Sequence, residues 1–246
     1  MYCMKKWIFN IIIIICLGVF CYSGYQLYLI FAENNVVKKE TKELKEIVNK
    51  ATEEGTDIDW DALKAKNEDI VAWIYIPDCD ISYPVVQGDD NAYYLTHTIE
   101  KQYNNNGSVF LDYQNNPAFL DDNSIMYGHS VEGGGMCTDL KKYADESFFN
   151  EHKTIYFLTP DANYECDVFV FAKTLDSSEY YTRNFGDGRE SLLNTWKTNA
   201  LYVNEVDETK NFITLSTCDL DYGFQALNRF VLVSTLEKTD KPITVE

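Results

Sequence analysis

The longest apolar run of the chain lies near its N-terminus. Residues 7–31 carry no charged side chain, and their centre is the isoleucine run 11–15. A helix over this stretch is long enough to cross a hydrocarbon core, which takes about 20 residues. A cleaved signal peptide is the alternative, but its apolar region should span only about 7–15 residues and end at a small-residue cleavage site. Because this run is longer and lacks such a site, we expect an uncleaved transmembrane anchor over 7–31.

The charges on either side of the run predict its orientation. Lys5 and Lys6 precede it, and the positive-inside tendency then places residues 1–6 in the cytoplasm and the rest of the chain outside. Lys38 and Lys39 on the far side weaken this orientation, but they lie further from the apolar run.

Helical periodicity continues beyond the anchor, over residues 32–70. Between Glu33 and Thr56, apolar residues recur at approximate helical spacing with charges between them. Asp59 can cap a second, short helix that begins at Trp60. We expect these juxtamembrane helices to lift the next domain off the membrane and to pack on its side.

From residue 71 onward the pattern changes to short runs of β-branched and aromatic residues, separated by Gly, Pro, Asn and Asp. Helices are predicted over 138–152 and over 190–199, the latter inserted before the strand that ends in Cys218, and residues 91–95 are expected to form a loop or a short helix. Many short strands with few helices predict a mainly β domain over 71–246, a closed antiparallel barrel or a sandwich. The predicted strands are 72–76, 82–86, 108–111, 124–127, 154–158, 166–172, 211–218 and 229–233.

Composition and charge limit the classes of function. Hydrophobic residues make up 46% of the chain and aromatic residues 15%, which excludes a disordered protein. The 21 Lys and Arg face 39 Asp and Glu, for a formal net charge of -18. Such a surface repels nucleic acid, so we expect no nucleic-acid partner. It also matches an anionic membrane surface poorly, so any attachment to the membrane must be hydrophobic.

Four of the seven cysteines lie outside the anchor region: Cys79, Cys137, Cys166 and Cys218. No C-x-x-C motif or Cys/His cluster indicates a zinc site, and we expect neither a metal nor another cofactor. Outside the cytoplasm a disulfide such as one between Cys79 and Cys166 is an open alternative to small, buried thiols.

Cys218 differs from the other cysteines because of its place in the pattern. It ends a predicted buried strand, Asn211–Cys218, and a turn-rich loop follows it. A thiol at the end of a strand is held by a rigid sheet while it faces a polar loop. Thiol chemistry needs a base or a cation nearby, because the thiolate is the reactive form.

Three histidines could supply the base. His129 follows Gly128 at the end of a predicted strand, as Cys218 ends its own strand. His152 lies at a helix end, where capping or solvation is expected, and His97 lies between threonines in a loop. Arg229 begins the strand after Cys218, and such a cation can stabilise an oxyanion. Alternatively, His129 is structural and Arg229 only pairs a carboxylate.

The same residues carry a family resemblance. Thr214-Leu215-Ser216-Thr217-Cys218 resembles the TLxTC signature of sortases, the membrane-anchored cysteine transpeptidases of Gram-positive bacteria. Tyr127-Gly128-His129 resembles the catalytic-histidine motif of that family, and Arg229 stands on the next strand as the family's arginine does. The resemblance covers nearly the whole chain, with the motifs in the right order. It implies the sortase-type β-barrel of about eight strands, with N-terminal helices and a helix inserted before the cysteine strand.

Within the family the chain is most similar to class B. A second hydrophobic segment at the C-terminal end and a lid before the barrel are both missing from the pattern, which argues against the pilin-polymerising class C. The stretches that follow the class B pattern are 73–77, 83–91, 94–95 and 107–112, together with the N-terminal helices and the insertion that holds the helix 190–199.

The resemblance also implies a mechanism and partners. Cys218 would attack a carbonyl within the C-terminal sorting motif of a secreted protein, and His129 would protonate the departing amine. Arg229 would lie near the oxyanion or hold the substrate backbone. An amine of a peptidoglycan precursor would then resolve the thioacyl enzyme. Cys218 and His129 could rest as a neutral pair or as an ion pair. The residues implied for the peptide groove are Asn91, Leu95, Ser216, Thr217 and Tyr181, of which Tyr181 could equally be an exposed loop residue.

Two other functions remain open from the sequence. A thiol peptidase would hydrolyse the same peptide without transferring it to an amine. A membrane-tethered β-barrel could instead bind a surface partner without any chemistry.

Overall fold

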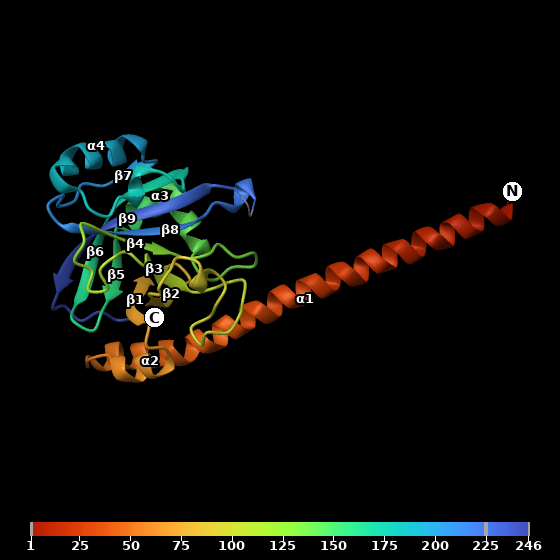
Figure 1. Cartoon of the computed structure of the whole chain (residues 1–246), viewed down its shortest axis with the longest axis horizontal. Helices are drawn as coiled ribbons and strands as arrows, with labels where there is room; N and C mark the ends of the chain where they lie inside the picture. Colours follow the sequence, from red (N-terminus) through yellow and green to blue (C-terminus); the bar gives the residue numbers. More distant parts are fainter. Residues whose placement is uncertain (1, 224–225, 246) are drawn as a thin grey trace.

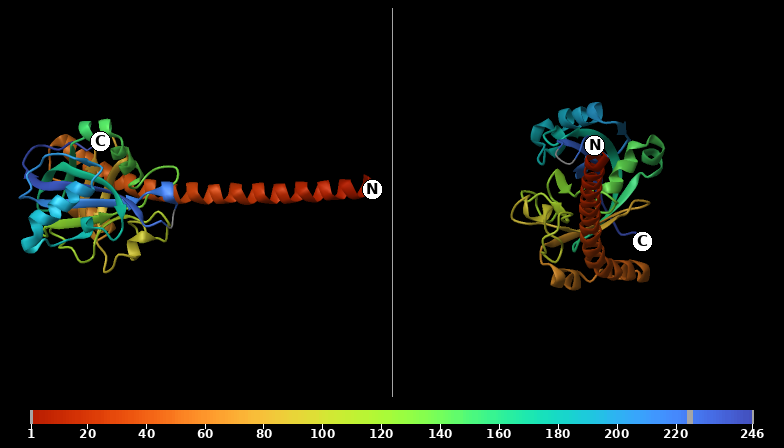
Figure 2. Two further views of the ribbon diagram at one scale, coloured as in Figure 1. Left: turned by 90° about the horizontal axis from the view of Figure 1, so that it is seen from above. Right: turned by 90° about the vertical axis from the view of Figure 1, so that its right-hand side faces the viewer.

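A long helix and a β-barrel make up the molecule (Figure 1). The structure, a computed structural model, describes residues 2–223 and 226–245, with residues 2–5 described by their backbone alone. Helix α1 (Tyr2–Glu54) projects from the barrel over its first half and lies against it over its second (Figure 2). The predicted anchor and the first juxtamembrane helix therefore form one continuous helix.

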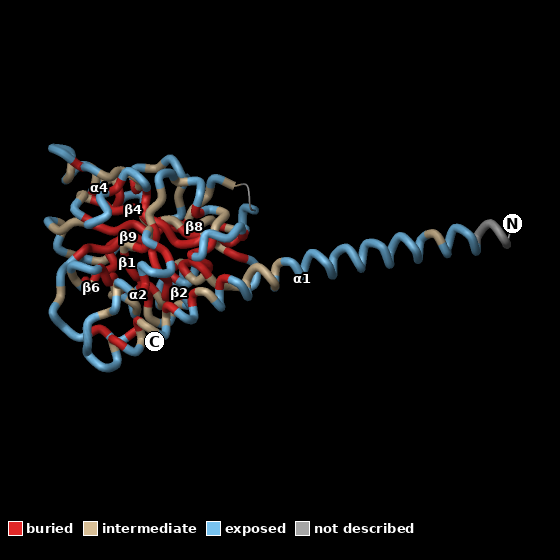
Figure 3. Tube along the Cα trace, turned by 60° about the horizontal axis from the view of Figure 1, so that its bottom comes forward, coloured by how far each residue is buried: buried red, intermediate tan, exposed pale blue. Residues whose placement is uncertain are grey.

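The exposure of α1 changes along its length (Figure 3). Nearly all side chains between Lys6 and Phe31 are exposed, whereas Leu44 and Val48 are buried against the barrel. A short turn then leads to α2 (Trp60–Lys66), and the Asp59 carboxylate accepts a hydrogen bond from the Ala62 amide at 2.9 Å, as expected for its N-cap.

In the part of the chain that the structure describes, nine strands form a single sheet whose order is β5-β1-β2-β3-β4-β8-β9-β6-β7. A further pairing of β5 with β6 closes the first eight into a barrel and leaves β7 beside β6. The predicted mainly β barrel with N-terminal helices is thus confirmed. The strands are β1 (Ile70–Ile76), β2 (Ile81–Val86), β3 (Val109–Leu111), β4 (Asn123–Tyr127), β5 (Thr154–Leu158), β6 (Asn163–Leu175), β7 (Tyr202–Val203), β8 (Asn211–Cys218) and β9 (Asn228–Thr239).

The barrel is mixed, where the sequence predicted an antiparallel one. β2 runs parallel to β3, and β4 runs parallel to β8. A parallel pair needs a crossover of a dozen or more residues. The connections 87–108 and 128–210 supply that length.

Short helices fill the connections. The helix predicted over 138–152 is interrupted at Asp145, whose backbone is extended and whose carboxylate accepts from the Phe148 amide at 3.0 Å. The inserted helix α4 (Arg189–Asn199) is confirmed, and its Trp196 packs on Phe212 of β8. The remaining short helices are η1 (Tyr93–Leu95), η2 (Thr138–Ala144), α3 (Glu146–Glu151), η3 (Glu179–Tyr181), η4 (Gly186–Gly188) and η5 (Leu220–Tyr222).

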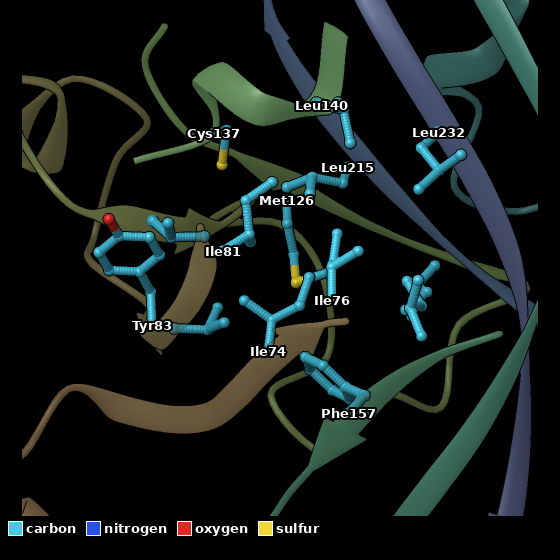
Figure 4. Close-up of a cluster of buried hydrophobic side chains, with 14 of the residues drawn as sticks. Ile74, Ile76, Ile81, Tyr83, Met126, Cys137, Leu140, Phe157, Leu215 and Leu232 are labelled. Atoms are coloured by element: carbon cyan, nitrogen blue, oxygen red, sulfur yellow. The ribbon is translucent and has the colours of Figure 1, made fainter. Parts of the chain in front are cut away.

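The barrel interior is filled by apolar side chains from all sides (Figure 4). Ile74, Met126 and Leu215 meet there from three different strands, and Cys137 lies in the same cluster. The cysteines among the described side chains are free, so a disulfide between Cys79 and Cys166 is not formed.

The end of β4 packs closely on the segment that follows it. A Cβ added at Gly128 would lie 2.4 Å from the Cys137 sulfur, so only glycine fits at this position. Gly128 precedes His129 directly, and this close approach lets the chain pass from β4 into the loop over a fully buried side chain.

We expect Gly128→Ala to reduce the free energy of unfolding by about 1–3 kcal/mol, because an extra methyl group overpacks the core. In the Gly128→Ala/Cys137→Ala variant the sulfur is gone, and the two changes should therefore be less than additive, with a coupling of at least about 0.5 kcal/mol. Urea unfolding of the full-length protein in detergent micelles measures the wild type, Gly128→Ala, Cys137→Ala and the double variant. Additive losses would show that the Gly128–Cys137 contact is not the cause.

Candidate active site

The three residues expected to perform the chemistry lie at or just beyond the ends of three neighbouring strands. Cys218 ends β8 and is the antiparallel partner of Arg229 at the start of β9. β4 runs parallel to β8 on the other side, and the Gly128 amide after it donates to the Ser216 carbonyl at 3.1 Å. The chain therefore delivers His129, Cys218 and Arg229 to the same end of the sheet.

A cleft of about 300 Å³ opens at this end of the barrel. All eight residues predicted for catalysis or substrate binding line it. The first of them, Asn91, and the last, Arg229, are more than half of the chain apart in the sequence. Its lining residues are Asn91, Leu95, Phe110, Tyr127, Gly128, His129, Asp176, Tyr181, Ser216, Thr217, Cys218 and Arg229.

The ring of His129 is held by the opposite wall of the cleft. Its Nε2 lies 2.8 Å from the carbonyl oxygen of Leu95, which ends helix η1. A carbonyl can only accept a hydrogen bond, so Nε2 carries a proton in this arrangement. In the neutral ring Nδ1 is then the nitrogen with a lone pair, and it is the atom that can take up and release a proton.

A serine next to His129 ties its loop to the cysteine strand. The Ser130 hydroxyl donates to the Cys218 carbonyl at 2.7 Å and lies 2.9 Å from the Thr217 hydroxyl. Since Ser130 has only one hydroxyl proton, the Thr217 hydroxyl must donate to Ser130. The buried side chain of Thr217 thus helps to hold the loop after His129 against strand β8.

Arg229 is held by the loop that precedes it and by an acidic neighbour. Its Nη1 donates to the carbonyls of Ala226 and Asn228 at 2.8 and 3.0 Å, and its Nη2 lies 3.3 Å from an oxygen of Asp176. Within residues 2–223 and 226–245, the Nε–H and the second Nη2–H have no hydrogen-bond partner. Arg229 therefore both pairs a carboxylate and keeps donors for a ligand in the cleft.

Tyr181 lies in the cleft wall and is not an exposed loop residue. Its hydroxyl is 2.8 Å from that of Ser216, and its ring stacks on Tyr127 with centroids 6.2 Å apart. Burial raises the pKa of Tyr181 to about 12, so its hydroxyl stays protonated at physiological pH. It can therefore serve as a hydrogen-bond donor or acceptor in the wall.

Asp112 connects several residues around the cleft, although the sequence did not identify it as a site residue. This buried carboxylate accepts hydrogen bonds from Asn91 at 2.8 Å, from Tyr127 at 3.1 Å and from Arg183 at 3.1 Å. The side-chain oxygen of Asn91 accepts in turn from the Tyr113 amide at 3.0 Å. The Asn91 side chain thus ties its own loop to residues 112–113 and, among the described residues, keeps one N–H for a ligand.

The other two histidines lie outside the cleft lining. His152 caps α3 and lies 3.2 Å from a carboxylate oxygen of Asp78, which agrees with the capping role predicted for it. His97 stacks on Tyr93 with ring centroids 4.0 Å apart. Among the described side chains, no three His, Cys, Asp or Glu residues are grouped so that they could hold a metal ion.

Comparisons with known proteins agree with this geometry. A family model for the sortase domain matches residues 74–237. Sortase B of Listeria monocytogenes is 31% identical over 232 residues, which cover 90% of this chain and 94% of that protein. Sortase B of Staphylococcus aureus is 28% identical over 241 residues, which cover 96% of this chain and 98% of that protein.

Solved structures of sortase B share the fold. A Staphylococcus aureus sortase B–substrate complex superimposes with a TM-score of 0.78 at 27% identity, covering 85% of this chain and 100% of that one. A sortase B from Bacillus anthracis gives a TM-score of 0.74 at 31% identity, covering the same 85% and 100%. With a family model that spans most of the barrel and with relatives aligned along nearly their whole length, this chain belongs to the sortase family, and within it to class B.

Proposed function

We propose that this cysteine transpeptidase cleaves a C-terminal sorting motif of secreted proteins and joins the new C-terminus to an amine of a peptidoglycan precursor. The observation that carries the proposal is the meeting of Cys218, His129 and Arg229 in a single cleft. A thiol, a base with a fixed tautomer and a cation with free N–H donors are the groups that acyl transfer requires.

The first half of the reaction forms a thioacyl enzyme. The Cys218 sulfur attacks the peptide carbonyl carbon, and the thiol proton goes to Nδ1 of His129. The developing oxyanion is stabilised by the free N–H groups of Arg229. When the C–N bond breaks, Nδ1 gives the proton to the departing amine, and the acyl group stays on sulfur.

The second half reverses these steps with a different amine. The incoming amino group attacks the thioester carbonyl and loses a proton to His129 Nδ1. Collapse of the tetrahedral intermediate releases Cys218, which recovers the proton. A new amide bond has formed without loss of the acyl group to water. The peptide lies along the wall formed by Asn91, Leu95, Tyr181, Ser216 and Thr217, which line the same cleft.

The N-terminal helix supports a membrane location. Among the described residues one helix is long and apolar enough to cross a membrane, and the apolar part of α1 is exposed. In this proposal residues 7–31 span the membrane once, with 1–6 in the cytoplasm. Residues 32–70 then hold the catalytic barrel, 71–246, on the outer side.

Replacing the thiol tests the nucleophile. We expect Cys218→Ala to abolish cleavage of a sorting-motif peptide and surface anchoring in cells, because Cys218 carries the one thiol among the described residues that line the cleft. Cys79→Ala is the matched control, because Cys79 lies outside the cleft and burial raises the pKa of its thiol to about 12. Cleavage that persists in Cys218→Ala would refute the role of Cys218 as nucleophile, and surface anchoring in cells that persists without cleavage would favour a binding module.

Supplying an amine separates transfer from hydrolysis. With a sorting-motif peptide and an excess of a peptidoglycan-type amine, the main product should be the peptide–amine adduct, measured by mass spectrometry. Cys218→Ala is the negative control, and omission of the amine should leave slow hydrolysis only. If water remains the sole acceptor at saturating amine, the protein is a thiol peptidase.

Changing the cation tests the oxyanion donor. Arg229→Lys keeps the charge but loses the planar set of donors, so we expect kcat to fall roughly 100-fold to 1000-fold. Lys173→Ala is the control, because this exposed cation lies over Phe230 of β9 and outside the cleft. Steady-state kinetics of peptide cleavage measure both variants, and an Arg229→Lys enzyme with unchanged kcat would exclude Arg229 from this role.

A further inference from the structure

We propose that the juxtamembrane turn of α1, residues 33–40, is a positioning element for catalysis, because it holds the two loops that fix His129. This inference rests on the proposed role of His129 as the proton carrier. The turn begins two positions after the apolar run ends at residue 31. The helix that anchors the enzyme would then also set the geometry of its active site.

The first of the two loops is the asparagine loop, residues 96–107, which lies along α1 where the helix meets the barrel (Figure 1). The side-chain amide of Asn104 donates to the Glu33 carbonyl at 3.0 Å, and that of Asn106 donates to the Asn34 side chain at 2.6 Å. Asn104 and Asn106 are both buried. Asn105 reaches the carboxylate of Glu33 at 2.7 Å. Three consecutive asparagines thus bind one turn of the helix.

A second attachment lies one to two turns further along α1. The carboxylate of Glu40 accepts from the Thr98 hydroxyl at 3.0 Å and from the Glu100 amide at 3.3 Å. The asparagine loop is therefore held to α1 at both of its ends.

The asparagine loop carries this restraint directly to Leu95. Gly107 has a φ of +58°, and a Cβ there would lie 2.7 Å from the Leu95 carbonyl oxygen, so the loop backbone packs against that group. The Ser108 amide donates to the Tyr94 carbonyl at 2.9 Å. The Leu95 carbonyl is the acceptor that holds Nε2 of His129. One chain of contacts thus runs from Asn34 through Asn106 and Gly107 to the catalytic ring.

The second loop, here the glycine loop, residues 130–136, follows His129 in the sequence. Gly133, Gly134 and Gly135 all have φ values between 89° and 96°, and three consecutive residues without a Cβ restrict the backbone little by themselves. Val37 of α1 packs in the same apolar cluster as Val131, and a Cβ on Gly133 would lie 3.7 Å from the Asn34 amide. The turn of α1 therefore supports His129 from both sides.

The expected consequence is a change in kcat with little change in substrate binding. The residues of this turn lie outside the cleft lining, so their loss should leave the KM for the peptide nearly unchanged. Displacing a catalytic group by about 1 Å can lower the rate roughly 100-fold. We therefore expect Asn34→Ala/Glu40→Ala to lower kcat roughly 10-fold to 100-fold.

The test uses the full-length protein in detergent micelles, with a sorting-motif peptide and an amine acceptor. The 15N resonances of the His129 ring give a second readout: the wild type should show the Nε2–H tautomer, and the double variant a mixture of both tautomers. Asn34→Ala/Glu40→Gln should recover part of the activity, because a glutamine oxygen can still accept a hydrogen bond from the loop. Lys42→Ala is the matched control, because Lys42 is an exposed residue of α1 that pairs with Glu46 of the same helix.

Rates are expressed per folded molecule, from near-UV circular dichroism of each variant. An Asn34→Ala/Glu40→Ala enzyme with wild-type kcat and an unchanged His129 tautomer overturns the positioning role and leaves α1 as a tether. A rise in KM at unchanged kcat overturns it as well, because it would place the effect in peptide binding. If the wild type itself failed to act on the peptide, the proposed function would be contradicted instead.

Discussion

The parallel pairing of β4 with β8 is the constraint on which the site depends. In a parallel pair both strands end at the same edge, so the loop that leaves β4 and the cysteine that ends β8 meet there. The antiparallel neighbour β9 starts at that edge and adds Arg229. An antiparallel β4–β8 pair would place His129 at the opposite end of the barrel. The long crossover 128–210 is therefore a condition of the proposed chemistry, because it lets the chain return in the parallel direction.

Burial determines which thiol can react. Desolvation raises the pKa of Cys137 and that of Cys166, both of which lie in the barrel interior, and it raises the pKa of Cys79 to about 12. These thiols stay protonated at physiological pH. Cys218 is partly exposed at the end of its strand, where a base and a cation share its cleft. The same fold therefore keeps these three thiols protonated and leaves the thiol of Cys218 accessible in the cleft.

Local patterns predicted eight of the nine strands in the described residues and the main site candidates, because strand ends and glycine breaks are encoded within a few residues, whereas the two-residue strand β7 is too short to leave such a pattern. Features that depend on contacts between distant segments were not predicted. The parallel pairs could not be foreseen, since alternation along a strand does not report the direction of its neighbour. Asp176 meets Arg229 only because β6 pairs with β9 up to Leu175, and the sequence carries no local sign of that register. Asp112 gives no local signal either, because its partners come from three separate segments.

The asparagine loop shows how a polar stretch of sequence can fix the position of a distant carbonyl group, that of Leu95. Three adjacent asparagines are typical of a solvated loop, yet two of these side chains are buried, and a buried amide without a partner costs about 1–3 kcal/mol. Their partners lie on α1, more than 70 positions earlier in the chain. Because α1 is continuous from the apolar run to residues 33–40, these residues cannot shift without moving the barrel relative to the apolar run. A free loop of this length would let the Leu95 carbonyl sample many positions, whereas a loop bound to a rigid helix holds it, and with it the ring of His129, in one.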